Sequence, residues 1–247
     1  MDNLLELQHI YFAYPDTGEK ALPSRNLLND VSLTVMPGQH IGLYGPNGSG
    51  KTTLFRLIVG LEKIRSGRLL FHNKPVLDEK DFHALRLKVG LVLQHAEDQL
   101  FCPTVLEDVA FGPLNMGMAP REARERALST LRELGLEGFE TRLTHRLSGG
   151  EQRLVALATV LAMRPDLLLL DEPSSELDPL ALKRLTDILQ NLPTARIVIS
   201  HDWDFLAAIS EKFVTIENGT LSESLTPFPH SHIHVHPLGD RPHAHQT

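Results

Sequence analysis

The sequence predicts an α/β fold built around a parallel sheet, and three observations predict it. A short apolar run at 41–44 precedes a glycine-rich turn and a predicted helix over 52–59. Four consecutive leucines, 167–170, suit a strand buried on both faces. The apolar runs 89–93 and 197–199 also lead into polar residues. Since open α/β sheets bind ligands at the carboxyl ends of their strands, we expect these strand ends to form a site.

The glycine-rich turn has the pattern of a phosphate-binding loop. Its glycines let backbone N–H groups turn inward and cradle phosphate oxygens at the positive end of the following helix. The pattern predicts that Lys51 reaches the β- and γ-phosphates of ATP and that the Thr52 hydroxyl ligates Mg²⁺. A plain glycine-rich turn is the simpler alternative, and the strand–turn–helix context disfavours it. The predicted ATP-binding residues here are Gly45, Pro46, Asn47, Gly48, Ser49, Gly50, Lys51, Thr52 and Thr53.

Two carboxylates, Asp171 and Glu172, directly follow the leucine run. An acidic pair in a loop is usually only solvated, but this pair stands at the end of a buried strand. We expect Asp171 to hold Mg²⁺ through its water shell. We expect Glu172 to polarise an attacking water, the positioning role that phosphoryl transfer requires.

A third motif, 147–151, precedes a predicted helix over 151–163. Ser148 and Glu151 have the spacing of a capping box, so an ordinary helix start explains them. Gly149 and Gly150 would also expose backbone N–H groups in the first turn, which is itself an anion site. Both interpretations hold together.

The order and separation of the three motifs resemble those of ATP-binding-cassette (ABC) ATPases. The resemblance implies a RecA-like P-loop NTPase, namely an ABC nucleotide-binding domain with an antiparallel β subdomain and an α-helical signature subdomain. It also implies a homodimer in which the turn from Ser148 to Glu151 binds the γ-phosphate held by the other subunit's loop.

The same resemblance assigns smaller pieces. Gln94 resembles the glutamine that senses Mg²⁺ and links the site to a membrane partner, and His201 resembles the γ-phosphate switch histidine. Asp178 belongs to a segment that resembles the loop crossing the dimer interface. Tyr14 resembles the aromatic residue on which adenine stacks, with Tyr11 as the competing candidate and a core aromatic cluster as the plainer explanation.

A narrower resemblance rests on the stretch 94–117, with its segments 97–101 and 107–113. It is most similar to the ATPase of energy-coupling-factor importers of the cobalt/nickel type, often called CbiO. This implies two membrane partners, a scaffold subunit and a metal-specific, substrate-binding subunit. Glu151 departs from the group, where Gln is common, and so does His95, where Asn is common.

The chain divides into an expected ATPase domain, 1–221, and a tail, 222–247. Within the domain, 4–35 alternates apolar and polar residues as antiparallel strands do. We expect 36–94 to form the first half of the nucleotide core and 165–221 to complete it. The helical subdomain is expected over about 95–164, and it contains an amphipathic helix over 121–134.

The tail holds six of the chain's 13 histidines and four prolines. Imidazoles suit Ni²⁺ and Co²⁺, and a flexible tail needs no preformed cage to wrap an ion. A disordered tail without a role is the alternative. The candidate ligands are His230, His232, His234, His236, His243 and His245.

Composition excludes several classes. A net charge of −7 argues against a broad basic face for nucleic acid, and the single cysteine, Cys102, suits a reducing compartment. No apolar run is long enough to span a bilayer, and the acidic start disfavours a signal peptide, so we expect a peripheral protein at the cytoplasmic face of the membrane. The 97 positions between Lys51 and Ser148 leave no room for the coiled coil of chromosome-maintenance ATPases. An importer of another substrate, such as a vitamin, and a soluble metal-binding regulatory cassette stay open as alternatives.

Overall fold

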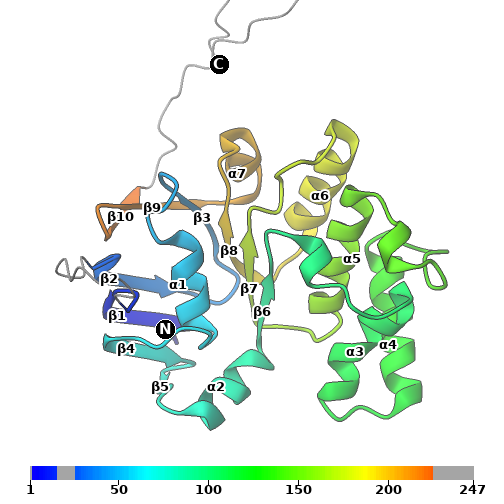
Figure 1. The fold of residues 1–247 in the computed structure, drawn as a ribbon, viewed down its shortest axis with the longest axis horizontal. Coiled ribbons are helices and arrows are strands. Elements are labelled where there is room, and N and C mark those ends of the chain that lie inside the picture. The colour runs from blue at the N-terminus through cyan, green and yellow to red at the C-terminus, as the bar shows by residue number, and fades with distance from the viewer. Residues whose placement is uncertain (1, 16–25, 225–247) are drawn as a thin grey trace, which may run out of the picture.

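The computed structural model of the 247-residue chain describes residues 2–15 and 26–224. Two sheets organise these residues, one of six strands and one of four. In Figure 1 the four-stranded sheet lies at the lower left, and helices α3 (Val105–Asn115), α4 (Pro120–Glu133) and α5 (Gly149–Leu161) lie together on the right. The six-stranded sheet runs from above the four-stranded sheet to the middle of the view, next to these helices. The predicted α/β fold with an antiparallel sheet and a helical subdomain is confirmed.

The six-stranded sheet is parallel except at one edge, where β10 runs antiparallel to β9. Its strands are, in spatial order, β10 (Thr220–Ser224), β9 (Lys212–Glu217), β3 (His40–Tyr44), β8 (Ala195–Ile199), β7 (Leu167–Asp171) and β6 (Val89–Val92). The last strand, β10, ends three residues beyond position 221, the expected end of the domain.

Alternate residues of the central strands belong to two different cores. In β7, Leu167 and Leu169 pack in the core shared with the antiparallel sheet and helix α1 (Lys51–Ile58), whereas Leu168 and Leu170 pack in the core shared with α3, α4, α5 and the later helices. Neighbouring β8 does the same with Ile197 and Val198. A strand that faces two cores needs apolar residues at every position, which explains the unbroken leucine run.

The antiparallel sheet has the order β2-β1-β4-β5. The predicted strands within 4–35 are β1 (Leu5–Phe12) and β2 (Leu28–Val35). The assignment of all of 36–94 to the nucleotide core was wrong for 66–75, because β4 (Ser66–Phe71) pairs with β1 and β5 (Lys74–Pro75) pairs with β4. In β4 only Leu69 is fully buried, so its sequence carries little strand periodicity.

The three helices predicted over 52–59, 121–134 and 151–163 are present, with ends within two residues of those bounds. The helix after the glycine-rich turn is α1 (Lys51–Ile58), and the predicted amphipathic helix is α4 (Pro120–Glu133), which buries Ala123, Ala127 and Leu131. The remaining helices are α2 (Glu79–Arg86), α3 (Val105–Asn115), α5 (Gly149–Leu161), α6 (Pro179–Asn191) and α7 (Trp203–Ile209), with short 3-10 turns at Ala96–Asp98 and Thr144–Arg146.

The start of α5 has the predicted capping box. The Ser148 side chain accepts from the Glu151 backbone N–H, and Glu151 Oε2 accepts from the Ser148 N–H at 2.9 Å. The hydrogen bond from the Ser148 backbone is the largest cause that lowers the pKa of Glu151. None of the helices within 2–15 and 26–224 combines the length and apolarity needed to cross a bilayer.

Candidate functional site

The glycine-rich turn joins β3 to α1, and its backbone requires glycine at two points. Gly45 has a φ of 141°, and a Cβ there would lie 2.7 Å from the carbonyl oxygen of Ile216. Gly50, the N-cap of α1, has a φ of 103°, and a Cβ there would lie 2.7 Å from the Leu28 side chain. Since L side chains rarely adopt these angles, the turn folds around the N-terminus of α1 only with glycine.

The Lys51 ammonium lies against this turn. Its Nζ donates to the carbonyl oxygens of Gly45 at 2.8 Å and Pro46 at 3.0 Å. Burial lowers the pKa of Lys51, while the charges of Glu172 and Asp171 raise it. A fixed cation beside a helix N-terminus makes this point of the surface attractive to phosphate.

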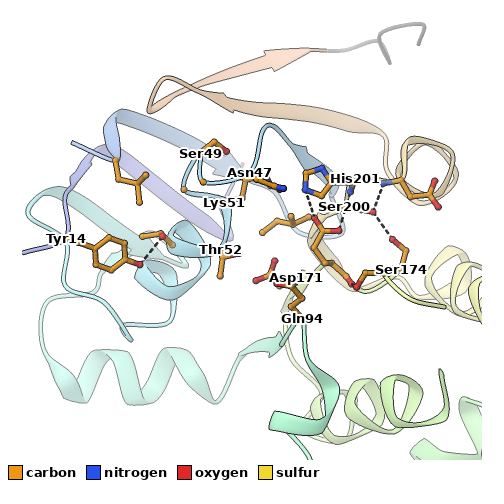
Figure 2. A pocket seen from close by; sticks show the side chains of 18 residues that line it. Tyr14, Asn47, Ser49, Lys51, Thr52, Gln94, Asp171, Ser174, Ser200 and His201 are labelled. Carbon is orange, nitrogen blue, oxygen red and sulfur yellow. Dashed lines mark hydrogen bonds and ion pairs between the residues drawn. The ribbon is translucent and has the colours of Figure 1, made fainter. Parts of the chain in front are cut away.

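Several strand ends meet at a cavity of about 740 Å³ (Figure 2), a volume typical of small-molecule sites. The turn after β3 and the segments after β6, β7 and β8 all contribute to it. The cavity is lined by Tyr14, Leu27, Asn47, Gly48, Ser49, Gly50, Lys51, Thr52, Thr53, Gln94, Asp171, Glu172, Ser174, Ser175, Ile199, Ser200, His201 and Asp202.

Most of the residues proposed from the sequence for ATP therefore border one space. Two residues of the turn do not line it. Gly45 lies at the end of β3, and Pro46 lines a smaller neighbouring hollow of about 270 Å³. Their carbonyls hold Lys51 instead.

Asp171 is the last residue of β7 and is only 4% exposed. Its Oδ1 has no hydrogen-bond partner among the described residues. Burial raises the pKa of this carboxyl, while a hydrogen bond from Thr52 and the charge of Lys51 lower it. A buried carboxylate oxygen without a partner is costly unless a cation joins it.

Mg²⁺ fits this arrangement. The carboxylate of Asp171, the hydroxyl of Thr52 and the amide of Gln94 all line the cavity, and oxygen ligands of this kind are those that Mg²⁺ prefers. Among residues 2–15 and 26–224, no cluster of three or more His, Cys, Asp or Glu side chains suits a metal ion. Most of the remaining ligands would come from the phosphates and from water.

Glu172 and His201 form a pair across the ends of β7 and β8. Glu172 Oε1 lies 3.4 Å from His201 Nε2, and Glu172 Oε2 accepts the His201 backbone N–H at 3.3 Å. Figure 2 shows the His201 ring directed to this contact at the cavity wall. The backbone of Glu172 has a φ of 48°, a strained value for a residue with a side chain.

Tyr14 lies at the cavity and Tyr11 does not line it. The Tyr14 hydroxyl is 3.1 Å from Thr53 Oγ1, and its ring meets Phe12 edge to face at 4.8 Å. Tyr14 is 44% exposed, so part of its surface is open to a planar base. Tyr11 is held in β1, opposite Ser66.

The Ser148–Gly150 turn lies apart from the cavity of its own chain. Ser148 and Gly149 are exposed, and a Cβ at Gly149 would meet no atom within 4 Å. Neither residue lines the cavity, and Glu151 does not line it either. Asp178 is the N-cap of α6, where its carboxylate accepts from the N–H groups of Leu180 and Ala181.

The sequence did not single out two serines at the cavity. Ser174 Oγ lies 2.7 Å from Ser200 Oγ, so the loop after β7 is joined to the end of β8. The sequence signal was position, since Ser200 directly precedes His201 and Ser174 lies two positions after Glu172. The histidine tail lies outside the residues that the structure describes.

Comparison with known proteins agrees with this geometry. A family model for ABC transporters matches residues 28–175. The chain belongs to the ABC transporter family. This ABC ATPase is 50% identical over 244 residues to an ABC transporter ATP-binding protein of Nitratidesulfovibrio vulgaris, covering 99% of this chain and 87% of that one. It is 37% identical over 228 residues to the energy-coupling factor transporter ATP-binding protein EcfA of Methanocaldococcus jannaschii, covering 91% and 79%.

Solved structures show the same fold. The ABC ATPase superposes on cbiO1 of Clostridium perfringens, part of the ABC transporter complex cbiONQ, with a TM-score of 0.81 and 32% identity, covering 91% of this chain and 89% of that one. It also superposes on a dimeric ATP-binding cassette in a post-hydrolysis state with ADP and Pi, with a TM-score of 0.79 and 28% identity, covering 91% and 100%.

Substitutions of Glu172 and of Lys51 in the ABC ATPase should impair different steps. Glu172→Gln removes the group assigned to orient water, so kcat for ATP should fall by about 10²- to 10⁴-fold while ATP binding persists. Lys51→Ala should weaken ATP binding itself. Steady-state hydrolysis and equilibrium ATP binding separate the two effects. Glu122→Gln, on the exposed first turn of α4, is the control. More than about a third of normal activity in Glu172→Gln would refute the assignment, because the expected loss is far larger.

Proposed function

We propose that this ABC ATPase powers an importer of the energy-coupling-factor type by closing a head-to-tail dimer around ATP. The observation that carries the proposal is the gathering of Lys51, Gln94, Asp171, Glu172 and His201 around one cavity. The similarity to EcfA and cbiO1 supports the type of transporter. In this proposal the chain works at the cytoplasmic face of the membrane, against a scaffold subunit that holds a substrate-binding subunit.

In hydrolysis the turn and Lys51 hold the β- and γ-phosphates, and Tyr14 stacks on adenine. Thr52, Asp171 and Gln94 would hold Mg²⁺, which when bound would neutralise phosphate charge. Glu172 orients a water whose oxygen bonds to the γ-phosphorus as the bond to the bridging oxygen of ADP breaks.

His201 contributes beside Glu172 in this scheme. Its Nε2 lies 3.4 Å from Glu172 Oε1, at the cavity wall where the γ-phosphate would stand. We assign it the role of a contact to that phosphate. While His201 contacts the γ-phosphate, its imidazole ring keeps a fixed position relative to the Glu172 carboxylate. When the phosphate is released, both side chains become free to move.

The dimer follows from the separation of the signature turn from the cavity. Ser148, Gly149, Gly150 and Glu151 begin α5 with a capped first turn that lies apart from the cavity of its own chain, and the N-terminus of a helix attracts an anion. A two-fold dimer supplies that anion from the partner's ATP and gives two identical composite sites. The dimeric post-hydrolysis neighbour supports this arrangement.

ATP should therefore control assembly. With hydrolysis blocked by Glu172→Gln, ATP should shift the protein from monomer to dimer in sedimentation. Ser148→Arg in that background should keep it monomeric, because a bulky cation would obstruct the first turn of α5. Ser129→Arg, at a half-buried position of α4 that does not line the cavity, is the matched control and should dimerise normally. If the protein stays monomeric with ATP both in Glu172→Gln alone and with Ser148→Arg added, the homodimer proposal is refuted. A heterodimer with a related cassette would then be left.

A docking place for the scaffold lies next to the nucleotide cavity. A hollow of about 410 Å³ shares Thr52, Gln94 and Asp171 with that cavity and adds apolar walls from Leu61 and Leu91. Leu61 is 63% exposed, although it is a large aliphatic side chain. A membrane subunit seated here would touch the loop that follows Gln94, which links its movement to the Mg²⁺ site.

Leu61→Glu should prevent docking and leave ATP binding unchanged. Co-purification with the scaffold from detergent-solubilised membranes is the measurement. Leu77→Glu is the matched control, because Leu77 is 78% exposed and does not line the hollow. Equal recovery of the scaffold with both variants would place the docking surface elsewhere on the protein.

We propose cobalt or nickel as the imported substrate. The support is the resemblance of 94–117 to the cobalt/nickel type and the six tail histidines, whose neutral imidazoles would bind either ion. An importer of another substrate, such as a vitamin, is the second candidate, since the name of the relative EcfA states no substrate. A soluble regulatory cassette is a third, which copurification with an integral membrane subunit would exclude.

Deleting 230–247 should leave basal ATP hydrolysis intact and remove most metal binding. An unperturbed histidine has a pKa of about 6.5, so the full chain should bind Ni²⁺ at about pH 7.5 and release it at about pH 5.5 as the imidazoles protonate. Calorimetry of the full and the shortened chain measures this binding.

The transported substrate is tested in cells. The measurement is uptake of radioactive Co²⁺ and Ni²⁺ by cells that carry the full chain, the Glu172→Gln variant or no chain. Equal metal binding by both chains would refute the role of the tail, and unchanged uptake without the chain would refute the metal substrate.

A further inference from the structure

One buried arginine joins the helix of the signature turn to the backbones of two proposed site residues. Arg153 lies in α5, five positions after Ser148, and is 7% exposed. Its Nη1 donates to the Glu172 carbonyl at 2.6 Å and to Ser175 Oγ at 3.1 Å. Its Nη2 donates to the Gln94 carbonyl at 3.1 Å. The guanidinium thus ties together three segments that are far apart in the sequence.

Stability alone does not account for a cation in this place. Burial lowers the pKa of Arg153, and the charges of Glu176, Glu97 and Glu172 raise it only as the lesser causes. Its direct partners are two carbonyls and a hydroxyl, not a carboxylate, and Nε has no partner among the described residues. Burying a charged side chain costs free energy that burying an apolar side chain does not. What the site gains from arginine is therefore the fork geometry of the guanidinium, which directs several N–H groups to separate acceptors.

The Glu172 carbonyl is the point where this geometry acts most directly. It accepts from Arg153, from the Ser175 N–H at 3.2 Å and from Ser175 Oγ at 2.9 Å. Glu172 has a positive φ of 48°, and such a residue keeps its conformation only when its surroundings over-determine it. The direction of the Glu172 carboxylate depends on that backbone, because the side chain starts from it.

The segment around Gln94 is held to the same helix twice. Besides the bond from Arg153, Gln99 Oε1 accepts the Leu93 N–H at 3.1 Å. Gln99 Nε2 donates in turn to the Ala156 carbonyl and to Thr159 Oγ1 on α5, each at 3.0 Å. A rotation or shift of α5 would therefore move the backbones at 93–94 and at 172 together.

We propose that Arg153 is a positioning residue for ATP hydrolysis that links the signature turn of a subunit to the water-orienting carboxylate of the same subunit. The proposal rests on the roles proposed above for Glu172, Gln94 and the signature turn. When a partner's ATP engages the first turn of α5, Arg153 carries the resulting position of the helix to Glu172 and Gln94. Each ATP would thus influence hydrolysis at the other site of the dimer.

The test compares two arginines that bridge elements through backbone carbonyls. Arg153→Lys keeps the charge, but a single ammonium cannot span the acceptors of the fork. We expect its kcat for ATP to fall on the order of 10- to 100-fold, the range for a misplaced catalytic group, with KM for ATP changed by less than about threefold. Arg184, on α6, donates to the carbonyls of Leu134 and Gly135 and lines no part of the cavity. Arg184→Lys should lower Tm, because hydrogen bonds to the two carbonyls are lost, and should leave kcat within about twofold of normal.

The outcomes separate this proposal from the function on which it rests. Loss of turnover in Glu172→Gln together with normal kcat in Arg153→Lys would overturn the positioning role alone. High turnover in Glu172→Gln would overturn the assigned site and this role with it. Equal loss of kcat in Arg184→Lys would show a general effect of destabilisation and also overturn the role. If Arg153→Lys does not fold, Ser175→Ala decides, since it removes one acceptor of Nη1 and one donor to Glu172, and a normal kcat there would refute the proposal.

Discussion

The parallel register of the central strands is the constraint on which the rest of the site depends. Leu170 of β7 is paired with Val92 of β6 and Val198 of β8, and Asp171 is paired with Ile199. Because the strands run in one direction and are aligned within a residue or two, their carboxyl ends open at the same edge. The turn before α1, Gln94, the carboxylates and His201 reach one cavity for this reason, although more than 150 positions separate the first from the last.

A second constraint is electrostatic. Lys51, Asp171 and Glu172 are all less than a tenth exposed, and the two carboxylates lie close enough to raise the pKa of Lys51 against the effect of burial. The opposite signs offset part of the cost of burial, and Asp171 keeps one oxygen unpaired. Such a site is arranged for a charged ligand with a cation, and not for its own stability. The strained backbone of Glu172 points the same way, since strain of this kind gathers at functional positions.

The sequence predicted the parts of this arrangement that repeat a local pattern. The turn at 45–52, the leucine run and the capping box of Ser148 each follow from neighbouring residues, and the structure has all three elements. The strand Ser66–Phe71 was missed because its pairing with β1 is long-range and only Leu69 is buried. Arg153 was missed for a related reason, since a charge in the first turns of a helix usually points to solvent. No local pattern could show that the segments at Gln94 and at 172–175 converge on it.

The leucine run has a consequence for how the carboxylates are aimed. Identical side chains at the first four positions of β7 leave its register undetermined, since a slip by one residue would still bury leucines in both cores. Hydrophobicity therefore cannot choose the register, and the polar end of the strand must do so. Just before β7, the Asp166 N–H donates to the Lys88 carbonyl at 2.7 Å, and its carboxylate lies 3.0 Å from His72 Nε2 and 3.7 Å from Lys88 Nζ. These partly exposed contacts of Asp166, at the end of β7 opposite the cavity, set the register of the strand. That register places Asp171 and Glu172 at the site.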